Sequence, residues 1–405
     1  MAVIRPFRAL RPLPDRAKDV ASAPYDVVTT VEARALVRGN PLSFLHVIRP
    51  EIDLPEGTDL YADMVYEKAG ENYTRLKEDG VLIEEEEPSL YIYRLSEGGH
   101  EQIGLAACCS VEEYERGRIR KHEHTRKDKE DDRLRHMLTL SANAGPVLLT
   151  YRGTGRIDAL VGEVIKGPAL YDFAAPDGVR HTIWRIMKSD EIIQAFQEVP
   201  LLYIADGHHR AAGAARVKLQ KHHDASADEE FLHFLAVLFP SDQMRILAYN
   251  RYVSDLWGVG EAEFLTAVQE RFKITAGADP EPKEKGRFGM YLGGKWYGLR
   301  SKGGRDADEG GPVSVLDLSV FSKNLFEPVL GIVDQKEDRR IDFIGGADSV
   351  KKIEVRVDAE GGVGFTFHPV SVDELLAVAD ADMIMPPKST WFSPKLRSGL
   401  LIHQF

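Results

Sequence analysis

The sequence has few of the features that would assign it to a specialised class of protein. Only two of its 405 residues are cysteines, Cys108 and Cys109. Adjacent cysteines in an apolar run point to opposite faces of a strand, which excludes a disulfide framework and a zinc site. No apolar run approaches the roughly 20 residues that span a bilayer, and the start of the chain lacks the hydrophobic core of a signal peptide. We therefore expect a cytoplasmic protein without a membrane partner.

The chain also lacks an excess of positive charge. Its formal net charge is −12 at pH 7, whereas binding to nucleic acid depends on neutralising phosphates with lysine and arginine. We therefore expect no nucleic-acid partner, and any anion must bind at a local site. With 405 residues, of which 43% are hydrophobic, the chain is long enough for two or three globular domains. The sequence leaves the oligomeric state open.

Neither of the two common nucleotide-binding fingerprints is present. The segment from Gly289 to Lys295 has the spacing of a P-loop, but Trp296 stands where a serine or threonine would bind Mg²⁺. The residues on both sides, 288–292 and 296–299, alternate like two strands around a Gly-Gly turn. The segment therefore predicts a β-hairpin, and no dinucleotide fingerprint occurs elsewhere.

Strand-like and helix-like segments alternate through the middle of the chain, which favours an α/β or α+β fold. Thr125 with Asp128 fits a capping box, and Ser189 is expected to cap another helix. The Gly-, Asp- and Glu-rich stretch 303–311 predicts a mobile loop. The apolar patterns predict helices at 59–78, 126–140, 190–196 and 372–379, and strands at 103–110, 146–151, 201–206, 231–240 and 244–248.

The most informative segment is Asp206-Gly207-His208-His209-Arg210, which ends the apolar run 201–206. Small residues follow, as suits a helix packed closely on its neighbours. Asp206 is thus expected at the carboxyl end of a strand, and the histidines at the amino end of a helix. Free N–H groups and the helix dipole favour anions there, and the guanidinium of Arg210 matches phosphate oxygens. Alternatively, Asp206 only caps the helix and the histidines are packing residues.

A second group of charged residues lies at 118–127, where seven basic or imidazole side chains surround one carboxylate, Glu123. So many nearby cations should keep Glu123 ionised at neutral pH. The carboxylate could then act as a general base or hold a metal. The alternative is a solvated helix start, in which Arg126 and Lys127 pair with Glu130 and Asp131 at helical spacing.

A transition-metal site of the hydrolase kind is another possibility. Its ligands would be His122, His124, His208 and His209, together with Asp206. Two adjacent histidines at the start of a helix cannot easily both turn to one metal, and no third helix supplies a spaced ligand pair. The metal site therefore remains the alternative to an anion site.

Three separated segments resemble the free L-serine kinases, which belong to the wider ParB and sulfiredoxin-like fold group. The first is the 206–210 segment, and the second, Lys121-His122-Glu123, is similar to the segment that carries the glutamate base in those kinases. The third, 385–395, is similar to their Pro-Lys-Thr-Thr tail. From residues 7–12 and 23–27 onward, the whole chain also resembles a broad bacterial and archaeal family, long without assigned function, that includes pyrophosphate-dependent L-serine kinases.

The resemblance implies a ParB/sulfiredoxin-like mixed core with an N-terminal extension and a large C-terminal insertion. We expect an N-terminal region at 1–100, a catalytic core at 101–240, an inserted α+β region at 241–360, and a C-terminal segment at 361–405 that returns to the active site. The chain is much longer than the ADP-dependent archaeal kinase, so the identity of the donor does not carry over. Histidines stand where sulfiredoxin has its catalytic cysteine, which excludes sulfinate repair.

The motifs and the resemblance together predict phosphoryl transfer from pyrophosphate to the hydroxyl of free L-serine, giving O-phospho-L-serine, with Mg²⁺ as cofactor. Glu123 is expected to act as general base, Asp206 to orient the acceptor or bind Mg²⁺, and His209 to join them in the catalytic centre. The donor phosphates are expected to contact Lys121, Arg126, Gly207, His208, Arg210 and Lys388. Serine is expected to contact His122, Ser389, Thr390 and Lys395.

Two other functions fit the same residues. A phosphatase acting on phosphoserine or a related phosphomonoester would use the same phosphate cradle with water as the acceptor. A ParB-like regulatory module would bind a nucleotide without consuming serine. Formation of phosphoserine from free serine separates the kinase from both.

Overall fold

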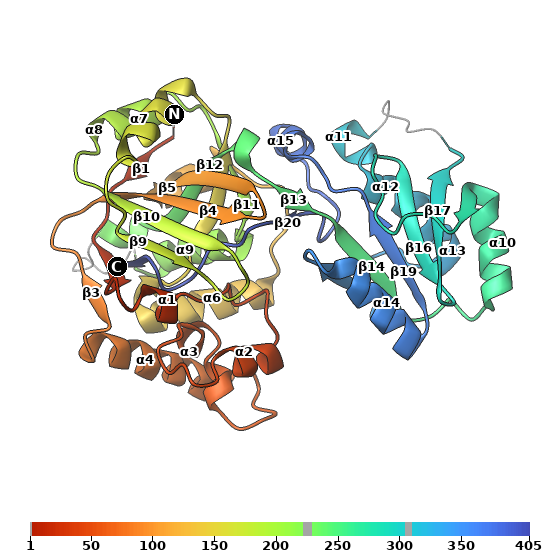
Figure 1. Ribbon diagram of the computed structural model, residues 1–405, viewed down its shortest axis with the longest axis horizontal. Helices are drawn as coiled ribbons and strands as arrows, with labels where there is room; N and C mark the ends of the chain where they lie inside the picture. Colours follow the sequence, from red (N-terminus) through yellow and green to blue (C-terminus); the bar gives the residue numbers. More distant parts are fainter. Residues whose placement is uncertain (1, 222–228, 304–309) are drawn as a thin grey trace. The chain divides into compact units, whose positions relative to one another are not determined.

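A computed structural model describes residues 2–221, 229–303 and 310–405. The chain forms two compact units, drawn in Figure 1. The first consists of Met1–Met244 together with Pro394–Phe405, and the second of Arg245–Ser393. The last twelve residues thus fold with the first unit, although they follow the second in sequence. Among the described residues, no helix is both long enough and apolar enough to span a membrane.

The first unit is built on a mixed sheet of nine strands in the described part of the chain. Most neighbours are antiparallel, but β11 runs parallel to β6, and β12 runs parallel to β8. Strand β1 (Ile4–Arg5) pairs with β5. The other strands follow the order β6 (Ile119–Arg120), β11 (Leu202–Asp206), β8 (Val147–Tyr151), β12 (His233–Pro240), β5 (His100–Ser110), β4 (Leu90–Glu97), β10 (Arg180–Ile186) and β9 (Tyr171–Ala174).

Helices bury apolar side chains against alternate residues of this sheet. Leu149 of β8, Ile204 of β11 and Ala236 of β12 are fully buried in the same core, as the period of two along a strand requires. Gly213 lets helix α9 approach α6, because a Cβ there would lie 3.2 Å from the Cβ of Arg133. The helices in this core are α5 (Val111–Glu115), α6 (Lys127–Leu140), α7 (Gly155–Val164), α8 (Asp190–Phe196) and α9 (His208–Lys221).

A smaller sheet joins the beginning and the end of the first unit. Its order is β3 (Leu82–Glu84), β2 (Ala9–Pro12), β21 (Ile402–Gln404) and β7 (Ala142–Asn143). Strand β21 pairs with a neighbour on each side, so the C-terminal segment is an integral part of this unit. The N-terminal helices near this sheet are α1 (Ala17–Val20), α2 (Thr30–Leu36), α3 (Leu45–Ile48) and α4 (Asp63–Glu78), with a 3₁₀ turn η1 (Pro50–Asp53).

The second unit has its own six-stranded sheet and its own core. The strand order is β15 (Phe272–Ala276), β17 (Lys295–Ser301), β16 (Arg287–Leu292), β19 (Val363–Phe367), β14 (Tyr249–Val253) and β18 (Ile341–Gly345). Strands β13 (Ile246–Leu247) and β20 (Trp391–Phe392) form a separate pair. The helices are α10 (Glu261–Arg271), α11 (Gly311–Ser314), α12 (Asp317–Phe321), α13 (Glu327–Leu330), α14 (Ser349–Glu360) and α15 (Val372–Asp380), with a π-helical turn η4 (Ser322–Phe326).

The structure confirms the mixed α/β class and most of the predicted elements. The P-loop-like segment is the hairpin of β16 and β17, and Gly293 and Gly294 both have positive φ in its turn. The capping box was a wrong prediction: α6 begins at Lys127 without a side-chain cap, and the carboxylate of Asp128 pairs with Arg126 instead. Ser189 occupies the capping position of α8, but its side chain makes no capping hydrogen bond. Residues 304–309 of the predicted loop lie outside the described residues.

Both cysteines lie on β5 and are buried. Cys109 belongs to the core shared with α5 to α9, so its neighbour Cys108 points to the other face of the sheet, as predicted. Burial raises the pKa of each thiol. These cysteines are therefore packing residues, because the thiolate is the reactive form.

Candidate functional site

The parallel pairing of β6 with β11 brings the two charged segments of the sequence together. Leu202 pairs with Ile119, and Tyr203 pairs with Arg120. The carboxyl ends of parallel neighbours meet at the same edge of a sheet. The segment 121–126, which follows β6, therefore lies beside the segment 206–210, which joins β11 to α9. Helices α6 and α9, which follow these two segments, lie side by side (Figure 1).

Two histidines form the buried centre of the candidate site. The rings of His122 and His208 are nearly perpendicular, with centroids 4.5 Å apart. The backbone N–H of His122 donates to Nε2 of His208 at 3.5 Å. Burial is the main cause that lowers the pKa of each ring to about 3. Both rings are therefore neutral at pH 7, so neither brings a positive charge to the site.

Glu123 lies next to this pair and remains accessible. Its side chain is 30% exposed, and Oε2 is 3.9 Å from Nδ1 of His208. Because Nε2 of His208 accepts a hydrogen bond, the neutral ring carries its proton on Nδ1, which faces this carboxylate. The carboxylate of Glu123 therefore has a neutral histidine on one side and is partly exposed to solvent on the other.

His209 and Arg126 meet through the backbone. The N–H of Arg126 donates to Nε2 of His209 at 3.2 Å. The guanidinium of Arg126 is paired with Asp128 at 2.8 Å and is largely exposed. Lys121 is also exposed, with its ammonium 4.0 Å from the centre of the Tyr114 ring. The ring of His209 is thus held at this loop by a backbone hydrogen bond, whereas the side chain of Arg126 points to the carboxylate of Asp128 in α6.

Asp206 is the acidic residue at the end of β11, and two cations surround it. Nζ of Lys395 donates to Oδ2 at 2.8 Å, and Nη2 of Arg210 lies 3.6 Å from Oδ1. The Arg210 side chain is buried, and its Nη1 donates to the carbonyl of Pro146. Gly207 has φ +94°, and a Cβ there would lie 2.9 Å from the guanidinium carbon of Arg210. Glycine is therefore required between the strand and the helix.

The arrangement of donors allows a test of the expected metal. Ligand atoms of His122, Glu123 and His208 lie within 4.8 Å of one another, and Nδ1 of His122 is buried without a hydrogen-bond partner. Two imidazoles and one carboxylate suit a transition metal better than Mg²⁺, which prefers oxygen ligands. At Asp206, the ammonium of Lys395 and the guanidinium of Arg210 oppose a further cation. Neither of these two groups of described residues therefore forms a ready-made Mg²⁺ site.

The predicted tail divides between the two units. Lys395 belongs to the first unit and contacts Asp206. Lys388, Ser389 and Thr390 belong to the second, so their contribution to the site stays a prediction. Within that unit, Oγ of Ser389 donates to the carbonyl of Pro386 at 2.6 Å, and Lys388 has φ +53°.

Two arginines outside the sequence motifs make hydrogen bonds in or to these tail segments. Nη2 of the fully buried Arg251 donates to the carbonyls of Pro387 at 2.7 Å and Lys388 at 3.1 Å. Arg397 lies close to Lys395 in sequence, and its Nε donates to Nε2 of His181 at 3.1 Å. The sequence signal for Arg397 was the basic character of the tail. Arg251 carried no signal, because it lies within an ordinary strand pattern.

Comparison with known proteins places the chain in a family. No curated protein matches it. Solved structures similar to it include a mutant free serine kinase in complex with AMP, at 15% identity over 73% of this chain and 92% of that chain, with a TM-score of 0.36. A conserved hypothetical protein from Pyrococcus furiosus matches at 14% identity over 73% and 94%, with a TM-score of 0.37. SbnI with a C-terminal truncation, from Staphylococcus aureus, matches at 13% identity over 74% and 87%, with a TM-score of 0.40. The sequence model of a family described as protein of unknown function (DUF1015) matches residues 4–319, and the chain belongs to this family.

Proposed function

We propose that this protein transfers a phosphoryl group to the hydroxyl of free L-serine, giving O-phospho-L-serine, with pyrophosphate as the preferred donor. The observation that carries the proposal is the position of Glu123. Its partly exposed carboxylate lies 3.9 Å from His208 at the start of α9, beside the Asp206 end of β11. A base and an anion-favouring helix start therefore share one sheet edge, as phosphoryl transfer to a hydroxyl requires.

Glu123 is the proposed general base. Phosphoryl transfer needs a group that accepts the proton of the attacking hydroxyl as its oxygen bonds to phosphorus. Asp206 is already engaged by Lys395, whereas Glu123 faces a neutral imidazole and solvent. The proton of serine would pass to a Glu123 oxygen while inorganic phosphate leaves pyrophosphate. His208 would orient that carboxylate through its Nδ1 proton.

The cations around Asp206 are proposed to stabilise charge on the transferred group. Lys395 and Arg210 both approach this carboxylate, and the first N–H groups of α9 add the positive end of a helix dipole. Asp206 would hold Lys395 in position and orient the acceptor. The ring of His209 accepts the N–H of Arg126 at Nε2 and would contribute a hydrogen bond to a phosphate oxygen through Nδ1, while the single N–H of His208 stays directed at Glu123. A magnesium ion would arrive with pyrophosphate, since Mg²⁺ is commonly bound through substrate phosphates.

Lys388, Ser389 and Thr390 are included on the resemblance of their segment to the kinase tail. A lysine and two hydroxyls suit a phosphate or a carboxylate. The test is Lys388→Ala, which should lower kcat/KM while thermal stability changes little. Deleting the tail is a poorer test, because it would remove β21 from the centre of its sheet.

One assay decides among the three functions. Purified protein is incubated with L-serine, Mg²⁺ and, in turn, pyrophosphate, ADP or ATP, and phosphoserine is measured by mass spectrometry. The kinase proposal expects phosphoserine, with the highest kcat/KM for pyrophosphate because no adenine-binding motif was found in the sequence. A higher kcat/KM for ADP or ATP would overturn the assignment of pyrophosphate as the preferred donor, but it would leave the proposed serine kinase activity in place. Release of phosphate from phosphoserine, without the forward reaction, would favour the phosphatase. Nucleotide binding without turnover would favour the regulatory module.

A further inference from the structure

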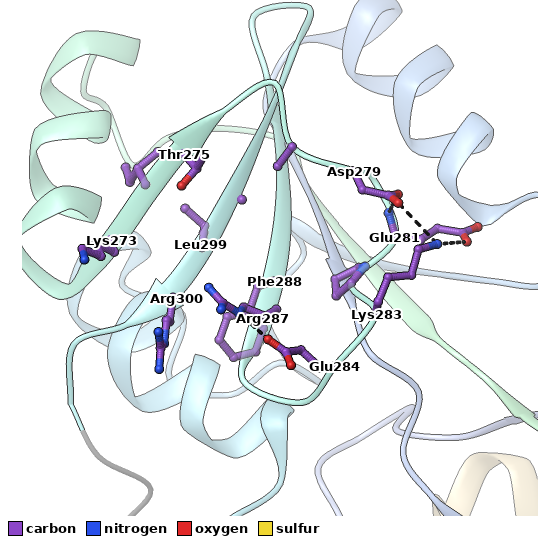
Figure 2. A pocket seen from close by; sticks show the side chains of 14 residues that line it. Lys273, Thr275, Asp279, Glu281, Lys283, Glu284, Arg287, Phe288, Leu299 and Arg300 are labelled. Atoms are coloured by element: carbon purple, nitrogen blue, oxygen red, sulfur yellow. Dashed lines mark hydrogen bonds and ion pairs between the residues drawn. The ribbon is translucent and has the colours of Figure 1, made fainter.

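The second unit contains a groove that the proposed reaction does not use. It has a volume of about 660 Å³ and lies between the face of strands β15, β17 and β16 and the loop that joins β15 to β16 (Figure 2). This volume lies within the usual range of small-molecule sites, about 300 to 1,000 Å³. On the same face, α14 packs mainly against β14, β16, β18 and β19. The groove thus occupies the end of the sheet that this helix leaves open.

Three cations form a row across the floor of the groove. Arg300 of β17 pairs in register with Lys273 on one side and with Arg287 on the other. Residues directly opposite on neighbouring strands have Cβ atoms about 5 Å apart, and like charges at such positions destabilise a sheet. We define Lys273, Arg300 and Arg287 as the cation row. Its members are labelled in the close view of the groove (Figure 2).

The carboxylates of the groove only partly neutralise this row. Glu284 accepts from Nε of Arg287 at 2.9 Å, and Arg287 in turn is the main cause that lowers the pKa of Glu284. Among the residues that the structure describes, Lys273 and Arg300 have no ion-pair partner. One carboxylate against three cations leaves two positive charges, which matches the charge of about −1.5 to −2 on a phosphate monoester.

The opposite wall of the groove is acidic and lies on the connecting loop. Lys283 lies 3.4 Å from both Asp279 and Glu281, so this wall keeps one negative charge in excess. Its carboxylate oxygens can accept hydrogen bonds from hydroxyl or amino groups. A ligand with a phosphate at one end and donors at the other fits this distribution of charge.

Glycines allow the loop to approach the sheet and leave the floor flat. A Cβ at Gly298 would lie 2.8 Å from the Cβ of Ala278, and a Cβ at Gly289 would lie 3.0 Å from the carbonyl of Pro280. A Cβ added at either glycine would lie on the same face of the sheet as the cation row, because Gly298 is two residues from Arg300 and Gly289 is two residues from Arg287. Close approach of the loop thus encloses the groove next to the cations.

We propose that this groove binds a small polar phosphate monoester, with the phosphate on the cation row and the remainder of the molecule between Gly298 and the acidic loop. The phosphate oxygens accept from the guanidinium groups of Arg300 and Arg287 and from the ammonium of Lys273. Bound phosphate also removes the repulsion within the row, so binding stabilises the fold. The proposal uses no step of the serine reaction, and either can fail without the other.

The first test measures thermal stability of the full chain in sodium phosphate and in sodium chloride at equal ionic strength. The comparison matters because any salt screens the cation row. The test variant is Lys273→Ser with Arg300→Ser. The control, Lys295→Ser with Lys351→Ser, removes two exposed lysines outside the groove and changes net charge equally. We expect phosphate to raise Tm of the wild type and of the control, and the test variant to lose at least half of that rise.

The outcome separates this groove from the site near Asp206. Phosphate bound only near Asp206 would raise Tm equally in all three proteins, and that result overturns the proposal. In chloride, the test variant should be at least as stable as the wild type, because it removes like-charge repulsion. A variant that unfolds is detected at this step, and the single substitution Arg300→Ser then replaces it in the same comparison.

The second test identifies the class of ligand by isothermal titration calorimetry. Ribose 5-phosphate and ribose are titrated into the wild type, the test variant and the control. We expect binding of ribose 5-phosphate that is at least tenfold weaker in the test variant and unchanged in the control, and no binding of ribose. Equal affinity of the wild type and the test variant for ribose 5-phosphate would overturn the assignment.

Discussion

Nζ of Lys395 donates a 2.8 Å hydrogen bond to Oδ2 of Asp206, across 189 positions of sequence. The bond connects the C-terminal segment to the strand end that precedes α9. Both side chains are partly buried, with 18% and 25% of their surface exposed. An ion pair in such a place is screened less than one on the surface. The pair therefore fixes one cation of the candidate site at the end of β11.

Replacing Lys395 tests this cation directly. Lys395→Ala should lower kcat/KM for phosphoserine formation, because a positioned positive charge is lost. The expected loss of transition-state stabilisation is on the order of 2 to 4 kcal/mol. Lys395→Arg keeps the charge and should recover part of the loss. Circular dichroism and Tm provide the control for folding. Full activity of a folded Lys395→Ala protein would remove this residue from the mechanism.

Glu123→Gln tests the proposed base with almost no change in size. The amide cannot accept the serine proton, so turnover should fall by roughly 100-fold or more while the KM values change little. Glu86→Gln, at an exposed glutamate of the acidic loop after β3, is the matched control and should leave turnover unchanged. The measurement is steady-state phosphoserine formation at saturating serine and pyrophosphate. Near-normal turnover of Glu123→Gln would rule out a base at this position.

The sequence predicted both halves of the candidate site, but it did not show how they meet. The strand at 201–206 and the helix after Gly207 follow from an apolar run and a cluster of small residues. Strand β6 consists of only Ile119 and Arg120, and two residues are too few to produce a detectable period. Without that strand, no physical reason visible in the sequence places Glu123 beside His208.

Burial also changed the chemistry that composition had predicted. Seven basic or imidazole groups near one glutamate suggest a highly charged site, yet His122 and His208 are neutral because they are buried. The tail shows a similar limit. Its sequence pattern reads as one segment over 388–395, but the boundary between the two units falls after Ser393. Such boundaries depend on long-range contacts that no local pattern contains.

Gly207→Ala tests the junction between β11 and α9. The backbone there has φ +94°, and the new Cβ would contact the guanidinium of Arg210. We expect a loss of about 1 to 3 kcal/mol in the free energy of unfolding, since an L-residue is strained at this φ. Gly162→Ala, in the last turn of α7 with nothing within 4 Å of the new Cβ, is the control and should be neutral or stabilising by up to about 1 kcal/mol. Chemical denaturation measures both, and equal stability of the two variants would contradict a left-handed turn at Gly207.

Acid should destabilise the protein through the buried histidines. Burial lowers the pKa of His208 from 6.5 to about 3, so between these values the unfolded chain binds a proton that the folded chain does not. The free energy of unfolding must then fall as pH decreases through this window, by at most about 1.4 kcal/mol per pH unit for each such histidine. His122 contributes in the same direction, because its pKa is also about 3. The stability from these two rings is fully present above pH 6.5.

His208→Gln should make this dependence less steep. Glutamine can accept the N–H of His122 but does not titrate, so the slope between pH 6 and pH 4 should decrease by up to about 1.4 kcal/mol per unit. The buried His136 and His181 contribute equally to the pH dependence of the free energy of unfolding in the wild type and in the variant. His124→Gln, at an exposed histidine of the same loop, should keep the wild-type slope. Urea denaturation at several pH values measures the effect, and an unchanged slope in His208→Gln would show that His208 is not held neutral by burial.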